Sequence, residues 1–332
     1  MGVPLKIFIA GGSGFIGTNL ISFLLAKRPQ LIAINVDDLS LTGRDYNAES
    51  DGRYQLEQIS ITDKDRMREL IIKEKPDAII NLAAQTHVDR SLKNVLPFFW
   101  TNVLGTLSIL EAIREAKQST WLSTIPLVHI STDEVYGELP VDQYATEQDK
   151  LNPGNPYSAT KAGADLMINA YVKTHKMRVR IVRLANCYGP YQLPEKFIPV
   201  AITNLLTGKP IPVYGEGRQR RQWLYVEEAC QAILTVLDHG EDGKIYNANG
   251  GTETDNITMA KKIAAFMDRP ETEITFVEDR KGHDFRYGMN DEPLRDLGWR
   301  PFEDLDLQLQ KTIQWYREHE EWWRRQKQWL NS

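Results

Sequence analysis

A chain of 332 residues that is 42% hydrophobic and 26% charged has the composition of a globular protein, which argues against disordered, collagen-like and coiled-coil classes. The net charge of -5 leaves no excess of Lys and Arg, so we expect no nucleic-acid partner. The two cysteines, Cys187 and Cys230, are too few for a disulfide framework and suit a reducing cytoplasm, where we expect them to be small buried hydrophobes.

Membrane segments are not expected either. The apolar run from Met1 to Ala10 lacks the basic leader and cleavage site of a signal peptide, and it breaks at the glycines that follow. No other stretch approaches the roughly 18 uninterrupted apolar residues of a membrane span. We therefore predict a soluble, cytoplasmic protein with no membrane partner.

In the first half of the chain, short apolar runs rich in β-branched residues alternate with amphipathic segments of helical length. The predicted strands are Lys6–Ala10, Leu31–Val36, Ala78–Leu82, Leu127–Ser131 and Arg178–Arg183. The predicted helices are Asn19–Lys27, Lys64–Lys73, Val103–Ala116 and Ser158–His175. Such alternation predicts an α/β protein with a doubly wound parallel sheet of Rossmann type.

The second half is less regular and has Pro-rich and Gly-rich stretches. Its predicted helices are Val226–Asp238, Met259–Met267 and Leu305–Trp315, followed by a Trp-rich tail that we expect to be a packing or lid element. We predict a dinucleotide-binding domain over residues 1–185. A smaller α/β substrate lobe, interleaved with the sheet, would take residues 186–332.

A glycine motif directly follows the first predicted strand. Gly11–Gly17 leads into a helix that we expect from Thr18, the order in which a backbone turn can approach a pyrophosphate. The next strand ends at Asp37, where a carboxylate can bind the adenine ribose hydroxyls and would repel a ribose phosphate, so NAD is favoured over NADP. A solvated turn is the alternative for Asp37, with Asp38 as its neighbour. The small residues that end another strand, Leu82-Ala83-Ala84, would let the chain pass close to that cofactor.

Two further segments carry the chemistry. Ser131–Gly137 follows a strand at the sheet edge where such folds bind ligands. Tyr157 and Lys161 stand four residues apart and share one helix face if their helix has begun. A tyrosine is a poor base at its usual pKa of about 10, but a neighbouring ammonium and a positive nicotinamide ring both favour the phenolate.

In this order and at these separations, the motifs resemble the extended short-chain dehydrogenase/reductase family. Within it, the chain resembles the dTDP-glucose 4,6-dehydratases over most of its length, and the Asp133-Glu134 pair is the feature that epimerases and decarboxylases of the superfamily lack. Matching stretches include His87–Ser91, Asn155–Lys161, Tyr188–Tyr191 and Gly282–Tyr287.

The resemblance implies a hydroxyl–tyrosine–lysine triad of Thr132, Tyr157 and Lys161. Asp133 would be the acid and Glu134 the base of an elimination, because the ketone formed at carbon 4 of the sugar acidifies the hydrogen on carbon 5. NAD contacts are implied at Gly11, Gly14, Phe15, Ile16, Gly17, Asp37, Leu82, Ala83, Ala84, Tyr157 and Lys161. Nucleotide-sugar contacts are implied at Thr86, His87, Asn186, Lys196, Arg221, His283 and Tyr287. No metal is expected.

Some positions depart from the pattern of these dehydratases. They are Gln85-Thr86 for Glu-Ser, Cys187 for Asn, Gln222 for Asp, Ala229 for His, and Ser60 for an Asp at the adenine. The catalytic residues are untouched, so the reaction type stands while a dTDP-hexose or a UDP-hexose stays open as substrate. A nucleotide-sugar epimerase or reductase, or a silent NAD-binding scaffold, is the alternative.

Family members pair two helices per subunit, which implies a homodimer through Val103–Ala116 and Ser158–His175.

Overall fold

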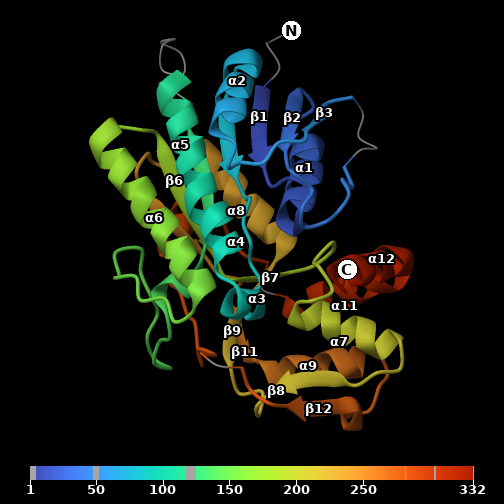
Figure 1. Ribbon diagram of the computed structural model, residues 1–332. Helices are drawn as coiled ribbons and strands as arrows, with labels where there is room; N and C mark the ends of the chain where they lie inside the picture. The colour runs from blue at the N-terminus through green and yellow to red at the C-terminus, as the bar shows by residue number, and fades with distance from the viewer. Residues whose placement is uncertain (1–4, 48–51, 117–124, 281, 303, 332) are drawn as a thin grey trace.

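The structure is a computed structural model that describes residues 5–47, 52–116, 125–280, 282–302 and 304–331. A seven-stranded parallel sheet forms its centre, with strand order β10-β6-β5-β4-β1-β2-β3 (Figure 1). Its strands are β1 (Leu5–Ala10), β2 (Leu31–Val36), β3 (Tyr54–Glu57), β4 (Ala78–Asn81), β5 (Leu127–Thr132), β6 (Val179–Leu184) and β10 (Ile245–Ala248). The predicted doubly wound Rossmann sheet is confirmed.

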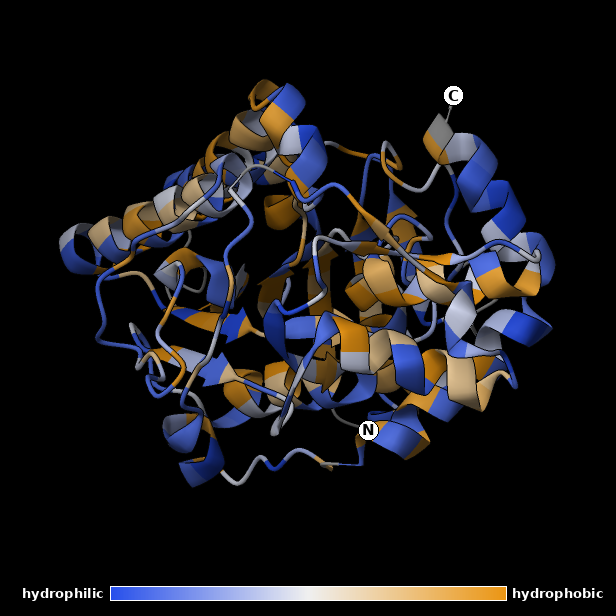
Figure 2. Cartoon of the chain, turned by 90° about the horizontal axis from the view of Figure 1, so that it is seen from below, coloured by the Kyte–Doolittle hydropathy of each residue, from blue (hydrophilic) through white to orange (hydrophobic). Residues whose placement is uncertain are grey.

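Alternate residues of each strand enter two separate cores, as the period of two requires. On β1, Ile7 and Ile9 join one hydrophobic cluster with α1 (Phe15–Lys27) and α8 (Val226–His239). Phe8 and Ala10 join the other, with α2 (Lys64–Glu74), α5 (Thr106–Glu115) and α6 (Pro156–His175). Figure 2 shows the helices around the sheet carrying both hydrophobic and hydrophilic stripes, as helices that cover a core do.

One continuous helix is longer than predicted. It starts at α4 (Leu96–Phe98), passes through the π-helical turn η1 (Phe99–Gly105) and ends with α5. Within the described residues, this stretch of Leu96–Glu115 is the one helix long and apolar enough to cross a membrane by length and composition, and half of its apolar window is buried inside the molecule. The sequence pattern missed its first two turns because Pro97 stands there, although proline is favoured at the first position of a helix.

The second half builds a lobe of short elements below the sheet in Figure 1. Two small sheets occur there, in the orders β11-β9-β7 and β12-β8. Their strands are β7 (Asn186–Tyr188), β8 (Ile211–Tyr214), β9 (Arg220–Tyr225), β11 (Thr252–Asp255) and β12 (Ile274–Val277). The helices of this half, besides α8, are α7 (Phe197–Leu206), α9 (Asn256–Phe266), α10 (Glu292–Asp296), α11 (Leu305–Glu318) and α12 (Glu320–Asn331). Because β10 and α8 complete the large sheet, this half is interleaved with the first, and the boundary at residue 185 stays a prediction.

Candidate active site

The glycine turn after β1 fits only glycine at two points. Gly11 has φ +80°, and a Cβ there would lie 2.6 Å from the backbone of Ala83 at the end of β4. A Cβ on Gly17 would lie 2.3 Å from the carbonyl oxygen of Gly11. Helix α1 begins at Phe15, earlier than the predicted Thr18, because Gly14 already serves as its extended N-cap. The turn therefore brings a helix N-terminus close to the ends of β1 and β4, where an anion can bind backbone N–H groups.

Asp37 closes β2 beside this turn. Its carboxylate accepts hydrogen bonds from the backbone N–H of Ser13 at 3.0 Å and of Leu39 at 2.8 Å. Burial raises the pKa of Asp37 to about 6. Asp37 lines a small cavity together with Asp38 and Ser60, and it is more buried than Asp38. A partly buried acceptor at this point suits the hydroxyl groups of a ribose.

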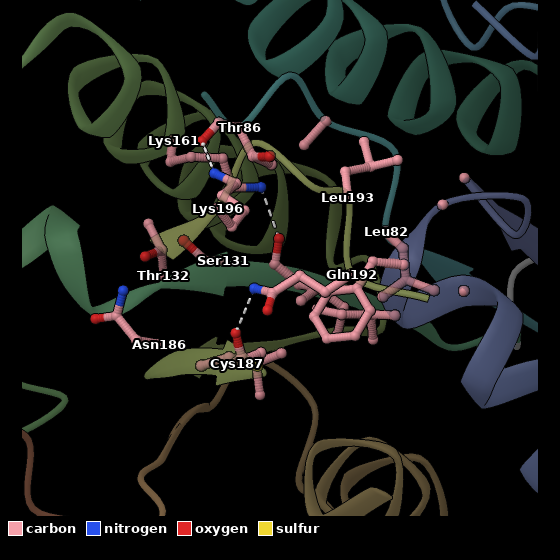
Figure 3. Close-up of a pocket in the computed structure, with 18 of the residues that line it drawn as sticks. Leu82, Thr86, Ser131, Thr132, Lys161, Asn186, Cys187, Gln192, Leu193 and Lys196 are labelled. Carbon is pink, nitrogen blue, oxygen red and sulfur yellow. Dashed lines mark hydrogen bonds between the residues drawn. The ribbon is translucent and has the colours of Figure 1, made fainter. Parts of the chain in front are cut away.

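A larger cavity adjoins this one at the carboxyl ends of β4, β5 and β6, and Figure 3 shows part of its wall. Fifteen of the predicted site residues line it, namely Gly11, Gly14, Phe15, Ile16, Gly17, Leu82, Ala84, Thr86, Thr132, Asp133, Glu134, Tyr157, Lys161, Asn186 and Lys196. Asp37 and Ala83 line the smaller cavity instead. The glycine turn and the predicted catalytic residues thus share one space.

The tyrosine and the lysine of the predicted triad both lie on α6 and both are buried. Burial and the charge of Glu134 raise the pKa of Tyr157 well above its usual value, while a hydrogen bond with Thr132 acts in the opposite direction. Lys161 Nζ donates to the carbonyl oxygen of Ile130 at 2.6 Å, and burial lowers its pKa to about 8. The protein alone therefore does not favour the phenolate, because desolvation outweighs the help expected from the lysine.

The neighbouring carboxyl groups occupy different surroundings. Asp133 is 2% exposed, and burial together with the charge of Glu134 raises its pKa to about 7. Its Oδ1 accepts from the hydroxyl of Thr132 at 3.0 Å. Glu134 is less buried and accepts from the Asn155 side chain at 3.1 Å. One carboxyl can hold a proton near neutral pH while its neighbour accepts hydrogen bonds, which is the division that an acid and a base require.

Asn155 connects this pair to the start of α6. Its Oδ1 accepts from the backbone N–H of Ser158 at 3.0 Å, and the Ser158 hydroxyl completes a capping box at the Asn155 N–H. The Asn155 amide group then donates to Glu134. The same side chain ends the loop, begins the helix that carries Tyr157, and orients the candidate base.

Several polar atoms in the larger cavity have no hydrogen-bond partner among the described residues. They are Asn186 Oδ1, Asp133 Oδ2, Ser131 Oγ and Gln192 Oε1. Buried polar atoms are seldom left unpaired, so this wall is suited to a polar ligand. Asn186 and Asp133 were predicted as site residues, whereas Ser131 and Gln192 were not. Ser131 lies on β5, at the start of the segment Ser131–Gly137 that the sequence indicated, and Gln192 reaches the cavity from a loop, where no spacing rule marks a residue.

The remaining predicted substrate residues lie outside the cavity lining. Arg221 stacks on the ring of Tyr287 at 4.3 Å, and its guanidinium donates to the carbonyl oxygens of Arg220, Asp284 and Phe285. Tyr287 reaches the site, since its hydroxyl lies 3.5 Å from Glu134 Oε2. Gln222, which departs from the family pattern, binds the backbone of Met289 through both ends of its amide.

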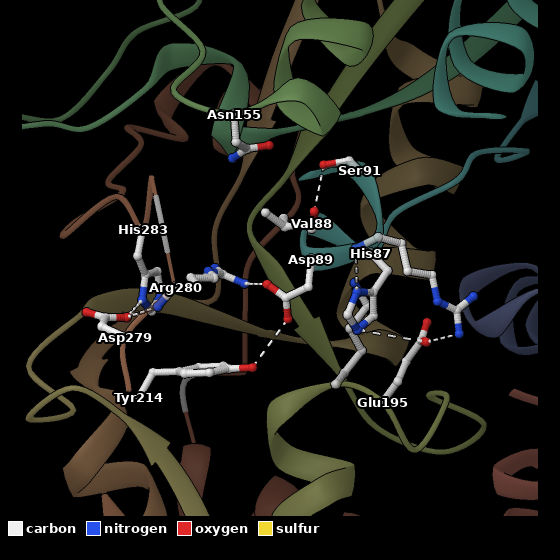
Figure 4. A network of polar contacts seen from close by, with 12 residues as sticks. His87, Val88, Asp89, Ser91, Asn155, Glu195, Tyr214, Asp279, Arg280 and His283 are labelled. Atoms are coloured by element: carbon white, nitrogen blue, oxygen red, sulfur yellow. Dashed lines mark hydrogen bonds and ion pairs between the residues drawn. The ribbon is translucent and has the colours of Figure 1, made fainter. Parts of the chain in front are cut away.

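The two predicted histidines belong to a polar network between the lobes (Figure 4). His87 Nε2 lies 3.8 Å from Glu195, and burial lowers its pKa. His283 Nδ1 lies 2.6 Å from Asp279, and burial lowers its pKa to about 4. Their substrate contacts stay predictions. Among the described residues, no group of three or more His, Cys, Asp or Glu side chains could hold a metal ion.

The sheet, the glycine turn after its first strand and the tyrosine–lysine helix define an enzyme of the extended short-chain dehydrogenase/reductase class. A model of the GDP-mannose 4,6 dehydratase family matches residues 8–312. The chain is 40% identical to a dTDP-glucose 4,6-dehydratase of Neisseria meningitidis, over 96% of this chain and 95% of that protein. It is 41% identical to a dTDP-glucose 4,6-dehydratase of Mycobacterium tuberculosis, over 96% of each.

Among solved structures, dTDP-glucose 4,6-dehydratase from Bacillus anthracis in complex with NAD superposes with a TM-score of 0.88 at 35% identity, covering 97% of this chain and 99% of that one. The chain belongs to the GDP-mannose 4,6 dehydratase family. The resemblance to the dTDP-glucose 4,6-dehydratases is thereby confirmed across nearly the whole chain.

Proposed function

We propose that the protein is an NAD-dependent hydro-lyase that converts dTDP-glucose to dTDP-4-keto-6-deoxyglucose. The observation that carries this proposal is the adjacent pair Asp133 and Glu134, two carboxyl groups with different surroundings in one cavity with Tyr157. An epimerase or reductase needs a tyrosine and a lysine but no such pair. The relatives in Neisseria and Mycobacterium that match over nearly their whole length support the same reaction and nucleotide.

The cavities fit NAD. The glycine turn leaves room that any Cβ would fill, and Asp37 offers a partly buried carboxylate at the end of β2. Gly11 to Gly17 would hold the pyrophosphate, and Leu82, Ala83 and Ala84 would line the cofactor's path between the two cavities. When bound, NAD supplies the acceptor for the hydride that leaves carbon 4 and returns that hydride to carbon 6.

The residues of the chain supply the proton transfers. Tyr157 takes the proton of the hydroxyl on carbon 4, and the positive charge of a bound nicotinamide opposes the burial that otherwise keeps the phenol protonated. Glu134 removes the hydrogen of carbon 5 as a proton, and Asp133 gives its proton to the hydroxyl that leaves carbon 6 as water.

The protons balance within the site. Glu134 returns its proton to carbon 5 after the hydride has reached carbon 6. Passing the proton gained by Tyr157 to Asp133 then restores every group, with the loss of one water from the sugar. Thr132 lies against Asp133 and orients it.

The test is incubation of the purified protein with dTDP-glucose and, separately, with UDP-glucose, following product mass and absorbance in alkali. We expect the loss of one water from dTDP-glucose and an alkaline chromophore of the 4-keto product. Loss of water from UDP-glucose alone would assign the enzyme to a UDP-hexose instead. An unchanged mass with a new sugar epimer would overturn the proposal in favour of an epimerase.

Two variants separate the steps. Tyr157→Phe should abolish hydride transfer, whereas Glu134→Gln should permit oxidation at carbon 4 and stall elimination. Deuterium at carbon 4 makes the first step visible as a kinetic isotope effect. Full dehydratase turnover by Glu134→Gln would show that Glu134 is not the base.

We further propose that the protein works as a cytoplasmic homodimer. Both cysteines are free, which suits a reducing compartment. Large apolar side chains are exposed on the helix pair expected at the dimer interface, with Leu96 57%, Trp100 52% and Leu166 59% exposed. Exposed apolar groups of this size on neighbouring helices suit a helix–helix interface between subunits.

Light scattering tests the dimer. We expect twice the mass of one chain for the native protein and a single-chain mass for Trp100→Glu combined with Leu166→Glu. Phe276→Glu, at a side chain that is 57% exposed on β12 in the other lobe, is the matched control and should stay dimeric. A single-chain mass for the native protein at micromolar concentration would reject the homodimer.

A further inference from the structure

The catalytic lysine has a histidine neighbour that the proposed reaction does not use. His129 lies on β5 with no solvent exposure, between Asn81 of β4 and Lys161 of α6. Its Nδ1 is 3.1 Å from Asn81 Nδ2, and its Nε2 is 3.3 Å from Lys161 Nζ. A fully buried imidazole so close to a lysine needs a physical reason.

The hydrogen bonds of Asn81 decide which ring nitrogen carries the proton. The backbone N–H of Ala83 can only donate, so the Asn81 atom that it reaches at 3.2 Å is Oδ1. The amide nitrogen therefore faces the other way, toward Thr106 Oγ1 and His129 Nδ1. The Thr106 hydroxyl donates to the carbonyl oxygen of Asn102, so its oxygen can accept the hydrogen bond from Asn81. Both hydrogens of the Asn81 amide are thus directed at acceptors, one of which is His129 Nδ1.

A neutral imidazole that accepts at Nδ1 carries its hydrogen on Nε2. Burial keeps it neutral, because it lowers the pKa of His129 well below its usual value, and the charge of Lys161 acts in the same direction. The Nε2–H group is then directed at Lys161 Nζ. An ammonium has no lone pair to receive this hydrogen, whereas a neutral amine has one.

We infer that His129 is a positioning residue for Lys161, which it holds against the carbonyl oxygen of Ile130 and whose positively charged form it disfavours. This inference rests on the proposed function, in which Lys161 assists Tyr157. His129 does not line the cavity that holds the glycine turn and the carboxyl groups of Asp133 and Glu134, so its influence passes through the lysine.

The other charges around Lys161 do not cancel this effect. Asp165, one turn further along α6, favours the ammonium, but its carboxylate is already paired with the buried guanidinium of Arg183 at 2.9 Å. Tyr157, one turn earlier, is neutral in the protein alone, since its pKa is raised. Among the described residues, Asp165 is thus the charged group that acts on Lys161, whose pKa burial lowers to about 8.

For the reaction, the consequence is that Lys161 loses its positive charge near pH 8. Below about pH 8, Lys161 is an ammonium that stabilises the Tyr157 phenolate; above it, that support is lost. By disfavouring the ammonium, His129 would add to the effect of burial, so that hydride transfer reaches its alkaline limit at a lower pH than an ordinary lysine, with its pKa of about 10.4, allows.

The first experiment is nitrogen-15 NMR of the full chain labelled at histidine and at the lysine side chain, with and without added NAD. We expect the His129 ring to stay neutral from pH 6 to 9 with hydrogen on Nε2, and Lys161 to titrate two or more pH units below exposed lysines. A ring with hydrogen on Nδ1, or a Lys161 that titrates with the exposed lysines, overturns the inference. No substrate is involved, so the result is independent of the proposed reaction.

Two isosteric variants test the cause. In Asn81→Asp, a carboxylate oxygen replaces the amide that faces His129, which should move the hydrogen to Nδ1, turn Nε2 into an acceptor and raise the titration midpoint of Lys161 by at least one pH unit. In His129→Gln, the oxygen can accept from Asn81 while the NH₂ group faces Lys161, so the midpoint should stay near that of the native chain. A raised midpoint in Asn81→Asp without a change of ring tautomer would mean that charge alone acts, and the inference would fail.

Discussion

At the scale of single residues, adjacent positions in the chain acquire different chemistry from their surroundings. Asp133 and Glu134 follow each other in η4 (Asp133–Tyr136), a short 3₁₀ turn, so their side chains leave the backbone in different directions. The Asp133 side chain is buried beside Thr132, and the Glu134 side chain accepts a hydrogen bond from the amide of Asn155. The turn after β5 thereby gives two similar carboxyl groups different surroundings, and in the proposed function one would be the proton donor and the other the proton acceptor.

This arrangement costs stability in a pH-dependent way. The pKa of Asp133 rises from 3.8 to about 7 on folding, so its contribution is favourable below pH 4 and is lost as pH rises through 7. At about 1.4 kcal/mol per unit, the ionised form costs on the order of 4 kcal/mol. Asp133→Asn should therefore be more stable than the native chain at pH 8 and gain little at pH 4, while losing dehydratase activity.

Denaturant unfolding at both pH values measures this difference. Asp142→Asn changes an exposed carboxylate to the same amide and is the matched control, with no expected pH dependence. Equal stabilities of the native chain and Asp133→Asn at pH 8 would mean that the Asp133 carboxyl is not held in a desolvated state.

Asp37 allows a second residue-scale prediction, about cofactor choice. Loss of hydrogen bonds to a charged acceptor costs about 1.5–3 kcal/mol, so Asp37→Ala should weaken NAD binding roughly tenfold to hundredfold. The same change should weaken NADP binding less, because a repelling carboxylate is gone. Asp38→Ala is the matched control, since Asp38 lines the same cavity but is exposed. Fluorescence titration with both cofactors checks the prediction. An equal loss of NAD affinity in Asp38→Ala would show that Asp37 is not the specific ribose contact.

The sequence indicated the residues that line the two cavities from strand ends and from α6 better than residues in loops, and the roles of both groups stay predictions. Glycine turns, strand ends and a tyrosine–lysine pair obey local spacing, so Gly11, Asp37, Thr132 and Lys161 could be placed from the chain alone. His87 and His283 could not, because their surroundings form only on folding: His87 meets Glu195 of the other lobe, and His283 meets Asp279 of its own irregular segment. Exposure and partners of such residues are properties of the folded chain.

At the scale of elements, α6 couples folding to the site through its N-cap residue. Asn155 caps the helix with its oxygen and holds Glu134 with its nitrogen, so one substitution can separate the two tasks. Asn155→Ser should keep the cap, because serine caps helices as well as asparagine does, and lose the longer reach to Glu134. Asn155→Ala should lose both.

We expect Asn155→Ala to be about 1 kcal/mol less stable than the native chain and Asn155→Ser to be nearly as stable. Both should eliminate water more slowly, while oxidation at carbon 4 is less affected. Thermal unfolding and single-turnover kinetics give the two readouts. Native elimination rates in Asn155→Ser would indicate that Glu134 needs no support from the cap.

The same scale explains which elements the sequence predicts. Five strands of the large sheet, β1, β2, β4, β5 and β6, were predicted to within one residue because buried parallel strands are continuous apolar runs. Its two edge strands, β3 and β10, are four residues long and were missed. The strands of the smaller lobe are only three to six residues long and include polar ones such as Thr252–Asp255, so no period marks them. Helix α7 was missed because it follows a proline-rich stretch and is apolar on most sides.

At the scale of the whole molecule, the Trp-rich tail contacts loops of both halves near the site. Tyr316 of α11 donates to the carbonyl oxygen of Gln192, which lines the larger cavity. Gln326 of α12 donates to the Tyr46 hydroxyl at 2.6 Å and to the carbonyl oxygen of Thr42 at 3.3 Å. The tail that we expected to be a packing or lid element thus packs on loops from both sides.

The loop that Gln326 holds is connected to the cofactor turn. Asn47 donates to the carbonyl oxygen of Gly12 at 3.1 Å, Asp45 accepts from the Ser13 hydroxyl at 3.2 Å, and Leu41 lines both cavities. Residues more than 270 positions apart therefore share one packed unit, and no local pattern could have shown that the tail supports the glycine turn.

This connection predicts that a change in the tail weakens cofactor binding at a distance. Gln326→Ala removes both hydrogen bonds to the loop, each with a net contribution of about 1 kcal/mol, so the dissociation constant for NAD should rise several-fold. Tyr46→Phe removes the 2.6 Å bond from the other side and should give a smaller rise in the same direction. Lys311→Ala, on the exposed face of α11, is the control and should leave NAD binding unchanged. Isothermal titration calorimetry measures the dissociation constant for NAD of the native chain and the three variants, and thermal unfolding measures their stability. Native NAD affinity in both Gln326→Ala and Tyr46→Phe would show that the tail packs on the loop without supporting the cofactor turn.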